Sequence, residues 1–121
     1  MARNSKNKKI HMLLISALVN KLMSEGYKVS ADHIGYPNGI PLAWEGYIPD
    51  IYAVKDGKEF FIEAETSDTL DSTKTRIEWT ALSSKPNVTF SIIVPERCLD
   101  KAKELEKKWN IKIKDFWTMK V

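Results

Sequence analysis

Three acidic residues surround the strongest turn signal in the sequence. Asp56-Gly57 is a dipeptide that favours a two-residue β-hairpin loop, and apolar, β-prone residues flank it on both sides. A two-residue loop fixes the strand pairing, and counting outward from it places Asp50 opposite Glu63. Glu65 follows two residues later and therefore lies on the same face of its strand. The sequence predicts three carboxylates in one small patch.

Such a patch needs compensation, because like charges that oppose each other across a strand pair are destabilising. A hard divalent cation is the natural partner, since carboxylate sites built from oxygen alone suit Mg²⁺ or Mn²⁺. Carboxylates around such an ion can assist in-line attack on a phosphodiester. The alternative is a solvated acidic end of a hairpin. A bulge would shift the register by one residue and separate Asp50 from Glu63.

Pro49-Asp50, the hairpin and then Glu63-Ala64-Glu65 resemble the PD-(D/E)xK nuclease superfamily. The superfamily pattern is PD, a variable gap that holds a hairpin, and then acid-x-lysine. The resemblance implies a Mg²⁺-dependent (or Mn²⁺-dependent) DNA endonuclease in which Asp50, Glu63 and the backbone carbonyl of Ala64 hold the metal. Glu65 stands in the lysine position, as in some E-x-E restriction endonucleases, and is expected to hold or activate the attacking water.

The same resemblance carries two further expectations. Minimal members of the superfamily often act as homodimers, and junction resolvases are of similar size, so we expect a homodimer that binds DNA. Because Glu65 replaces the lysine, the alternative is a catalytically inactive relative that binds nucleic acid or a protein partner. An unrelated α/β domain with incidental acids is the third interpretation.

A helix predicted over residues 70–84 carries a lysine on its apolar stripe. That stripe consists of Leu70, Lys74, Ile77 and Ala81. Lysine is rarely buried without a partner. The resemblance implies that the missing lysine has moved to this helix, where Lys74 would reach the three carboxylates; the alternative is a lysine stem that snorkels to solvent. Arg76 lies on a different face and is predicted to touch a DNA phosphate or nothing.

The N-terminal residues 1–9 form a basic segment. Its cations are Arg3, Lys6, Lys8 and Lys9. They predict either a flexible, solvated terminus or an arm that contacts DNA phosphates. An amphipathic helix follows over residues 7–25, stopped by Gly26. His11 is expected to face solvent or the basic segment, and it is too far from His33 in sequence to suggest a zinc site.

The remaining patterns complete an α/β fold. The expected elements are a strand over residues 27–33, a loop over 34–47, a β-branched strand over 87–95, a helix over 96–109 and a strand over 111–117. The 87–95 strand follows a helical crossover, so it should run parallel to the second hairpin strand. The order predicts one domain over residues 1–121, with a central mixed β-sheet flanked by helices. This is the αβββαβ core of the restriction-endonuclease-like fold, plus a C-terminal helix and strand.

The loop over residues 34–47 is long for a small domain, and long ordered loops are often functional. Trp44 and Tyr47 in it are expected to pack under the loop or to stack on a base. Glu45 is a further acid whose position the sequence does not fix.

Composition excludes several classes of function. The single cysteine permits neither an internal disulfide nor a cysteine metal cluster. The sequence shows no apolar run that would span a membrane and no signal peptide, so a cytoplasmic location is the default expectation. No Gly-rich phosphate loop and no Ser/His/Asp arrangement is visible, and no organic cofactor is expected. The net charge of +3 is compatible with a polyanionic partner.

Overall fold

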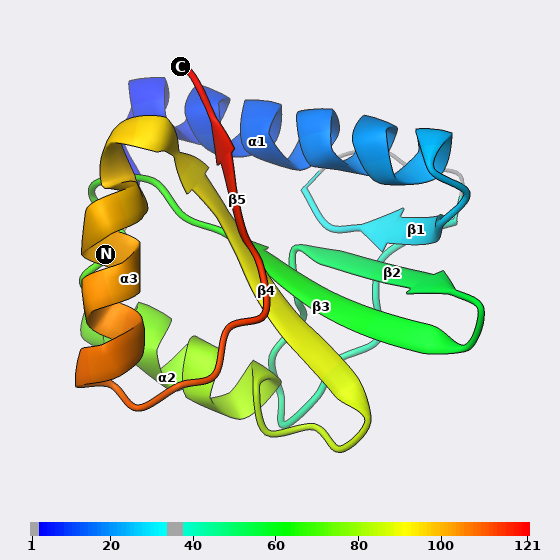
Figure 1. Ribbon diagram of the computed structural model, residues 1–121. Helices are drawn as coiled ribbons and strands as arrows, with labels where there is room; N and C mark the ends of the chain where they lie inside the picture. Colours follow the sequence, from blue (N-terminus) through cyan, green and yellow to red (C-terminus); the bar gives the residue numbers. More distant parts are fainter. Residues whose placement is uncertain (1–2, 34–37) are drawn as a thin grey trace.

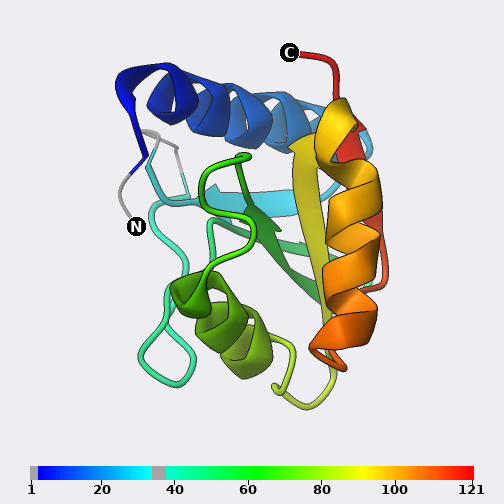
Figure 2. The same ribbon diagram turned by 90° about the vertical axis from the view of Figure 1, so that its left-hand side faces the viewer.

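Five strands form one mixed sheet that lies between helices on its two faces (Figures 1 and 2). The computed structural model describes residues 3–33 and 38–121. Its elements are α1 (Ser5–Ser24), β1 (Lys28–Ala31), β2 (Ile51–Lys55), β3 (Lys58–Ala64), α2 (Thr73–Leu82), β4 (Val88–Pro95), the short 3₁₀ helix η1 (Glu96–Cys98), α3 (Leu99–Lys108) and β5 (Phe116–Met119). This order confirms the predicted α/β fold with an αβββαβ core and a C-terminal helix and strand.

The hairpin of β2 and β3 forms as the turn signal predicts. Asp56 and Gly57 have φ angles of 53° and 77°. Both values lie in the left-handed region that a type I′ loop requires, which aspartate and glycine tolerate better than most residues. The antiparallel pairing then runs without a bulge from Lys55–Lys58 to Ile51–Ile62. The register on which the acidic patch depends is therefore the predicted one.

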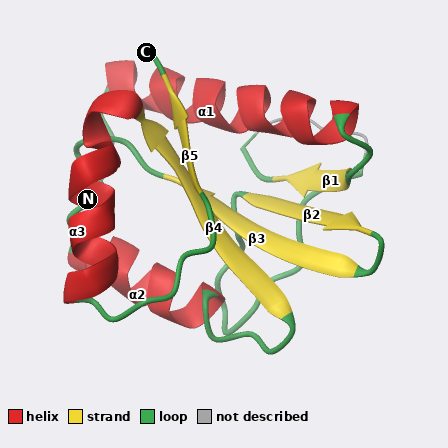
Figure 3. Cartoon of the chain, viewed as in Figure 1, coloured by secondary structure: helices red, strands yellow, loops and turns green. Residues whose placement is uncertain are grey.

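The sheet has the strand order β1-β2-β3-β4-β5. β1, β2 and β3 pair antiparallel, whereas β3, β4 and β5 pair parallel, which confirms the predicted direction of β4. Parallel neighbours need a crossover, and α2 supplies it between β3 and β4. Figure 3 shows α1 along one side of the strands and α2 and α3 on the other. β4 is accordingly buried along most of its length.

Two hydrophobic clusters lie on opposite faces of the sheet. α1 packs on one face against Ile62 and Ala64 of β3. α2 and α3 pack on the other face against Phe61. Because side chains alternate along a strand, Glu63 has the parity of Phe61 and belongs to the α2 face. The hairpin thus directs Glu63 away from α1, toward the start of α2.

The first helix differs from its prediction at its start and on its buried face. It begins at Ser5, where the Asn4 side chain accepts a hydrogen bond from the Asn7 N–H, and it ends before Gly26 at φ 91°. The apolar spacings of three and four residues predict a buried stripe of Ile10, Leu13, Leu14, Ala17, Leu18 and Leu22. Of these, Leu13 and Ala17 are exposed, and Ile15 and Val19 are buried instead. The sheet meets a face rotated by about one residue from the predicted one, which brings His11 inward.

The second helix is shorter than predicted and presents a different face to the sheet. Residues 67–72 form turns, and the Ser72 side chain caps the helix by accepting the Thr75 N–H. The buried side chains of α2 are Thr75, Trp79 and Leu82. Ile77 is 48% exposed, so the stripe that began at Leu70 is wrong. Leu70 is buried, but in the preceding turn rather than on the helix.

The last strand begins five residues later in the chain than predicted, at Phe116. β5 begins at Phe116 and pairs parallel with β4 at the edge of the sheet. Ile111 and Ile113 are buried in the cluster beneath α3 without being part of a strand. The alternating apolar residues that predicted a strand here belong to a buried connection instead, because a side chain can be buried without its backbone pairing in a sheet.

Part of the loop before β2 packs against the rest of the protein, whereas Leu42 is 89% exposed. Trp44 and Tyr47 bond to each other through both backbone N–H groups and contact the α2-face cluster. Glu45 is exposed at their turn. Residues 34–37 of the predicted loop lie outside the described residues. Within residues 3–33 and 38–121, no helix combines the length and the apolar character that a membrane span requires.

Candidate functional site

Asp50 and Glu63 meet one position beyond the end of the β2–β3 ladder. The backbone N–H of Asp50 donates a hydrogen bond to Glu63 Oε2 at 2.8 Å. Both residues are buried, with 7% and 3% of their surface exposed. The predicted opposition of these two acids is therefore present, at the edge of the sheet where β3 leads toward α2.

The Asp50 carboxylate accepts contacts from three directions. Its Oδ2 accepts the Ala64 N–H at 2.9 Å and lies 3.2 Å from His11 Nε2, and its Oδ1 lies 3.2 Å from His33 Nε2. Burial acts to raise the pKa of Asp50, but the hydrogen bonds from the two histidines outweigh it and hold the pKa well below its usual range. Asp50 is thus the ionised acid of the site.

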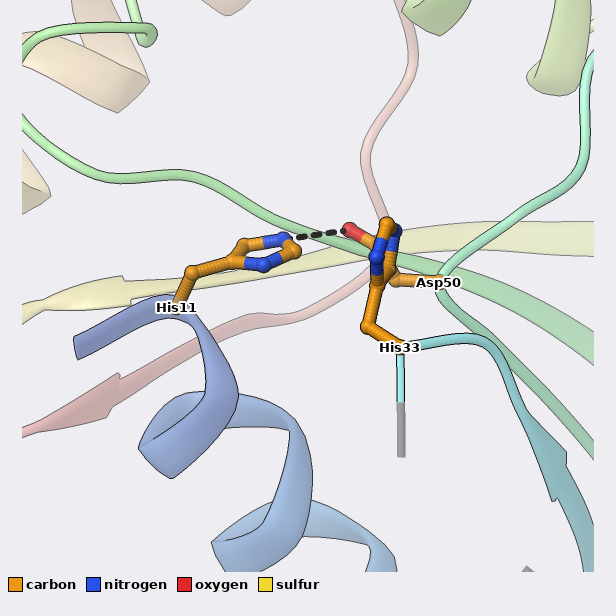
Figure 4. Close-up of side chains that lie close together, drawn as sticks. All are labelled: His11, His33 and Asp50. Atoms are coloured by element: carbon orange, nitrogen blue, oxygen red, sulfur yellow. Dashed lines mark hydrogen bonds and ion pairs between the residues drawn. The ribbon is translucent and has the colours of Figure 1, made fainter. Parts of the chain in front are cut away.

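The two histidines are the largest departure from the sequence-based expectations. His11 does not face solvent: it is buried on α1 and points at Asp50 (Figure 4). His33, at the end of β1, comes to the same carboxylate, and the two rings lie 5.0 Å apart. The expectation that they are too distant for a shared site was wrong, because separation along the chain says little about separation across a folded sheet.

Glu63 is a buried acid without a direct cationic partner among the contacts above. Burial raises its pKa well above the ordinary value, and the charges of Asp50 and Glu65 add to that effect. A group in this position holds a proton unless a cation offsets its charge. The acidic patch therefore has the electrostatic character that the sequence predicted.

Glu65 lies in the same patch but is held by several donors. Its carboxylate accepts hydrogen bonds from the Thr69 hydroxyl at 2.9 Å, the Trp79 indole N–H at 3.1 Å and the Arg3 guanidinium at 3.3 Å. Burial and the charge of Asp50 nevertheless raise the pKa of Glu65 to about 8. Trp79 and Thr69 were not among the predicted site residues; the only signal for Trp79 was its spacing of four residues from Thr75.

Arg3 supplies the cation that lies nearest to this patch. Besides Glu65, its guanidinium donates to the Ala64 carbonyl oxygen and to Thr66 Oγ1, both at 3.0 Å. The side chain is 20% exposed. Arg3 was predicted as a phosphate contact on a basic arm, whereas the structure turns it inward onto the carbonyl that was predicted as a metal ligand.

The other predicted basic residues lie outside the patch. Lys6, Lys8 and Lys9 are exposed on the first turns of α1, so most of the predicted arm is helical. Arg76 is exposed on α2.

Lys74 does not reach the three carboxylates. Its side chain is 72% exposed and pairs with Glu78 at 3.8 Å, so its assignment to an inward face was wrong. The helix starts at Thr73 with Ser72 as its cap, which places Thr75 rather than Lys74 toward Glu65.

A cavity of about 150 Å³ opens onto these groups. All three acids line it, together with both histidines and Arg3; Lys74 lies at its wall beside Glu78. Within the described ranges, no buried side-chain nitrogen or oxygen lacks a hydrogen-bond partner. The cavity is therefore a polar chamber whose walls are pre-arranged by their own contacts, with space left for water, an ion or a small part of a ligand.

Comparison with known proteins gives a fold and no family. No family model matches the sequence, and no curated protein matches it. An XisH family protein from Nostoc punctiforme has a similar structure, with a TM-score of 0.52 and 17% identity over 87% of this chain and 90% of that chain. An fdxN element excision controlling factor protein from Anabaena variabilis gives 0.52 and 15%, over 91% of each chain. At these identities the likeness establishes the shared fold alone.

Proposed function

We propose that the protein is a metal-dependent nuclease that hydrolyses phosphodiester bonds in DNA. The observation that carries the proposal is the burial of Asp50, Glu63 and Glu65 around one cavity, with the pKa values of two of them raised. Titratable groups shifted by burial and by one another in a cleft are typical of active sites. The PD-hairpin-ExE order of the sequence supports the same interpretation.

The residues of the site fit a divalent cation. Asp50 and Glu63 would hold it, because their carboxylates are adjacent and buried and Glu63 has no cationic partner among the contacts described above. The Ala64 carbonyl is a third ligand only if it serves both the ion and Arg3, which already donates to it. A bound Mg²⁺ or Mn²⁺ would supply charge to the scissile phosphate and lower the pKa of a water.

Two other groups of the chain have separate tasks in this proposal. Glu65, whose pKa burial raises to about 8, would accept a proton of the attacking water in its ionised form, which is the minor form at neutral pH. Arg3 stands in for the superfamily lysine, because its guanidinium lies on Glu65 and lines the cavity where a phosphate would enter. Lys74 contributes charge from the cavity wall.

DNA is the proposed partner. The exposed lysines at the start of α1 and Arg76 on α2 would contact its backbone, which positions a protein without reading sequence. One structural neighbour is described as a factor that controls excision of the fdxN element, so we extend a role in DNA excision control to this chain as part of the proposal. Action as a homodimer would give a small domain enough surface to hold duplex or branched DNA.

A second candidate is a relative with the same fold that binds DNA or a protein without cutting. Glu65 favours it: four donors already fix its carboxylate, and the lysine of the superfamily pattern is absent at this position.

Cleavage assays separate the two candidates. The full chain is incubated with supercoiled, nicked and branched DNA and with Mg²⁺ or Mn²⁺, beside Glu63→Gln and the control Glu45→Gln, whose acid is exposed. We expect product from the wild type and the control only. Retarded migration of DNA without product, unchanged by Glu63→Gln, would establish the binding candidate. Identical wild-type and Glu63→Gln behaviour on every substrate rejects the nuclease.

A further inference from the structure

Both histidines of the chain converge on one carboxylate. The sequence contains two histidines, and the side chains of His11 and His33 each bring Nε2 to 3.2 Å from an oxygen of Asp50 (Figure 4). The ligand-capable atoms of the three residues all lie within 4.8 Å of one another. Among the described residues, no other group of three or more His, Cys, Asp and Glu side chains meets this distance criterion. The three acids predicted from sequence do not form such a group.

Three separate elements hold this group in place. His11 is buried on α1, His33 follows β1, and Asp50 precedes β2. The Asp50 carboxylate is fixed by the hydrogen bond that it accepts from the Ala64 N–H. The backbone just before His33 is fixed by the Asp32 N–H, which donates to the Asp50 carbonyl at 2.9 Å. The arrangement therefore depends on the folded sheet, with His11 and Asp50 buried and the His33 side chain 48% exposed.

We propose that His11, His33 and Asp50 form a binding site for a divalent first-row transition metal such as Mn²⁺, Co²⁺, Ni²⁺ or Zn²⁺, in preference to Mg²⁺. Imidazole nitrogens suit transition metals, whereas Mg²⁺ prefers an all-oxygen shell. Two nitrogens and one carboxylate therefore select against the ion that the acidic patch alone would suggest. This inference deepens the proposed function by naming the class of ion that the site takes.

The spacing of the atoms is compatible with one shared ion. Ligands that each lie about 2.0–2.2 Å from an ion are separated by about 2.9–3.5 Å from one another at right-angled to tetrahedral geometry. The two observed nitrogen–oxygen separations of 3.2 Å, from His11 to Oδ2 and from His33 to Oδ1 of Asp50, fall in that range, and one ligand atom from each of the three residues lies within 4.8 Å of the others. They also fit hydrogen bonds, so the alternative is a histidine–aspartate–histidine network that binds no ion.

The cavity supplies the open side that a reactive ion needs. Glu63 and Glu65 line it together with the three proposed ligands. A metal held by three protein ligands keeps positions free for water or a phosphate oxygen, and Glu63 is placed to take one of them or to hold the water. Glu63 and Glu65 would then act beside the ion, whereas Asp50 would bind it directly.

Metal titration of the metal-free full chain, with any histidine tag removed, tests the site. Calorimetry with Mn²⁺, Ni²⁺ and Mg²⁺ is compared for the wild type, His11→Gln, His33→Gln and the control Met12→Gln, which changes the exposed neighbour of His11. We expect one Ni²⁺ ion per chain, bound more tightly than Mg²⁺, and a loss of about tenfold or more in each histidine variant. The control and the Mg²⁺ affinity should not change.

Mg²⁺ affinity equal to that of Ni²⁺, or wild-type Ni²⁺ binding by both histidine variants, overturns the inference. Should a variant fail to fold, the ¹⁵N resonances of the wild-type imidazoles decide: Zn²⁺ must shift Nε2 of both histidines, and unmoved resonances reject the site. Cleavage supported by Mg²⁺ and unaffected by His→Gln keeps the nuclease and rejects this site. Tight Ni²⁺ binding without cleavage keeps the metal site and rejects the nuclease.

Discussion

The backbone N–H of Asp50 donates to Glu63 Oε2 at 2.8 Å, so one acid of the site is held by the main chain of the other. Asp50 is at the same time the anion that helps to raise the pKa of Glu63. The strand register thus fixes the two side chains together although their charges repel. This conflict between geometry and charge determines how the site should respond to substitution, pH and ions.

Replacing Glu63 by Gln should stabilise the ion-free protein. At pH 8 an unfolded Glu is ionised, whereas folding requires the buried Glu63 to regain a proton, and the amide removes that cost. We expect a gain of about 1 kcal/mol, or roughly 4 °C in the melting temperature, and weaker stabilisation by added Mn²⁺. Thermal melting with and without Mn²⁺ measures both. The exposed Glu104→Gln is the control; a lower melting temperature with Mn²⁺ stabilisation retained would contradict the prediction.

Stability of the ion-free protein should fall as pH rises from about 5 to about 8. The pKa of Glu65 rises from an ordinary 4.5 to about 8 on folding, so the folded state binds more protons across that window. The raised pKa values of Glu63 and His33 act in the same direction. Urea unfolding across this range measures the slope. Glu65→Gln should flatten it, and a wild-type stability that is constant with pH would show that these acids are not coupled to folding.

Arg3 and Lys74 should differ sharply in their effect on stability. Arg3 makes three hydrogen bonds to the buried patch, and its loss leaves Glu65 without a cation, so Arg3→Ala should cost about 1–3 kcal/mol. The exposed Lys74–Glu78 pair should contribute less than about 0.5 kcal/mol. Urea unfolding of Arg3→Ala and Lys74→Ala gives the comparison. A larger loss of unfolding free energy for Lys74→Ala than for Arg3→Ala would mean that Lys74 interacts with the buried acids.

Much of the fold could be predicted because its signals are local. Asp56-Gly57 determined the hairpin register, and that register alone brought Asp50 to Glu63. Gly26 ended α1 as expected. The buried face of α2 was missed because Leu70 was taken as part of the helix, although Ser72 caps it two residues later.

The part of the site that could not be predicted depends on packing between distant segments. His11, His33 and Asp50 come from three elements whose contact is fixed only when α1 settles on the sheet. The inward turn of Arg3 is of the same kind, since a terminal arginine carries no local sign of its partner. A helix face shifted by one residue was the available clue to His11, because Ile15 and Val19 share its side of α1.

Removing the indole donor of Trp79 should weaken the protein most where Glu65 is ionised. The Trp79 N–H donates to Glu65 Oε2 at 3.1 Å inside the core, and such a bond favours the charged form of the acid. Trp79→Phe should therefore cost about 1–3 kcal/mol, with a larger loss at pH 9 than at pH 6. Urea unfolding at both pH values measures the difference. Trp109→Phe is the control, because Trp109 packs edge-on against Trp79 at 5.4 Å. Equal losses at the two pH values for Trp79→Phe would mean that only ring packing had been removed.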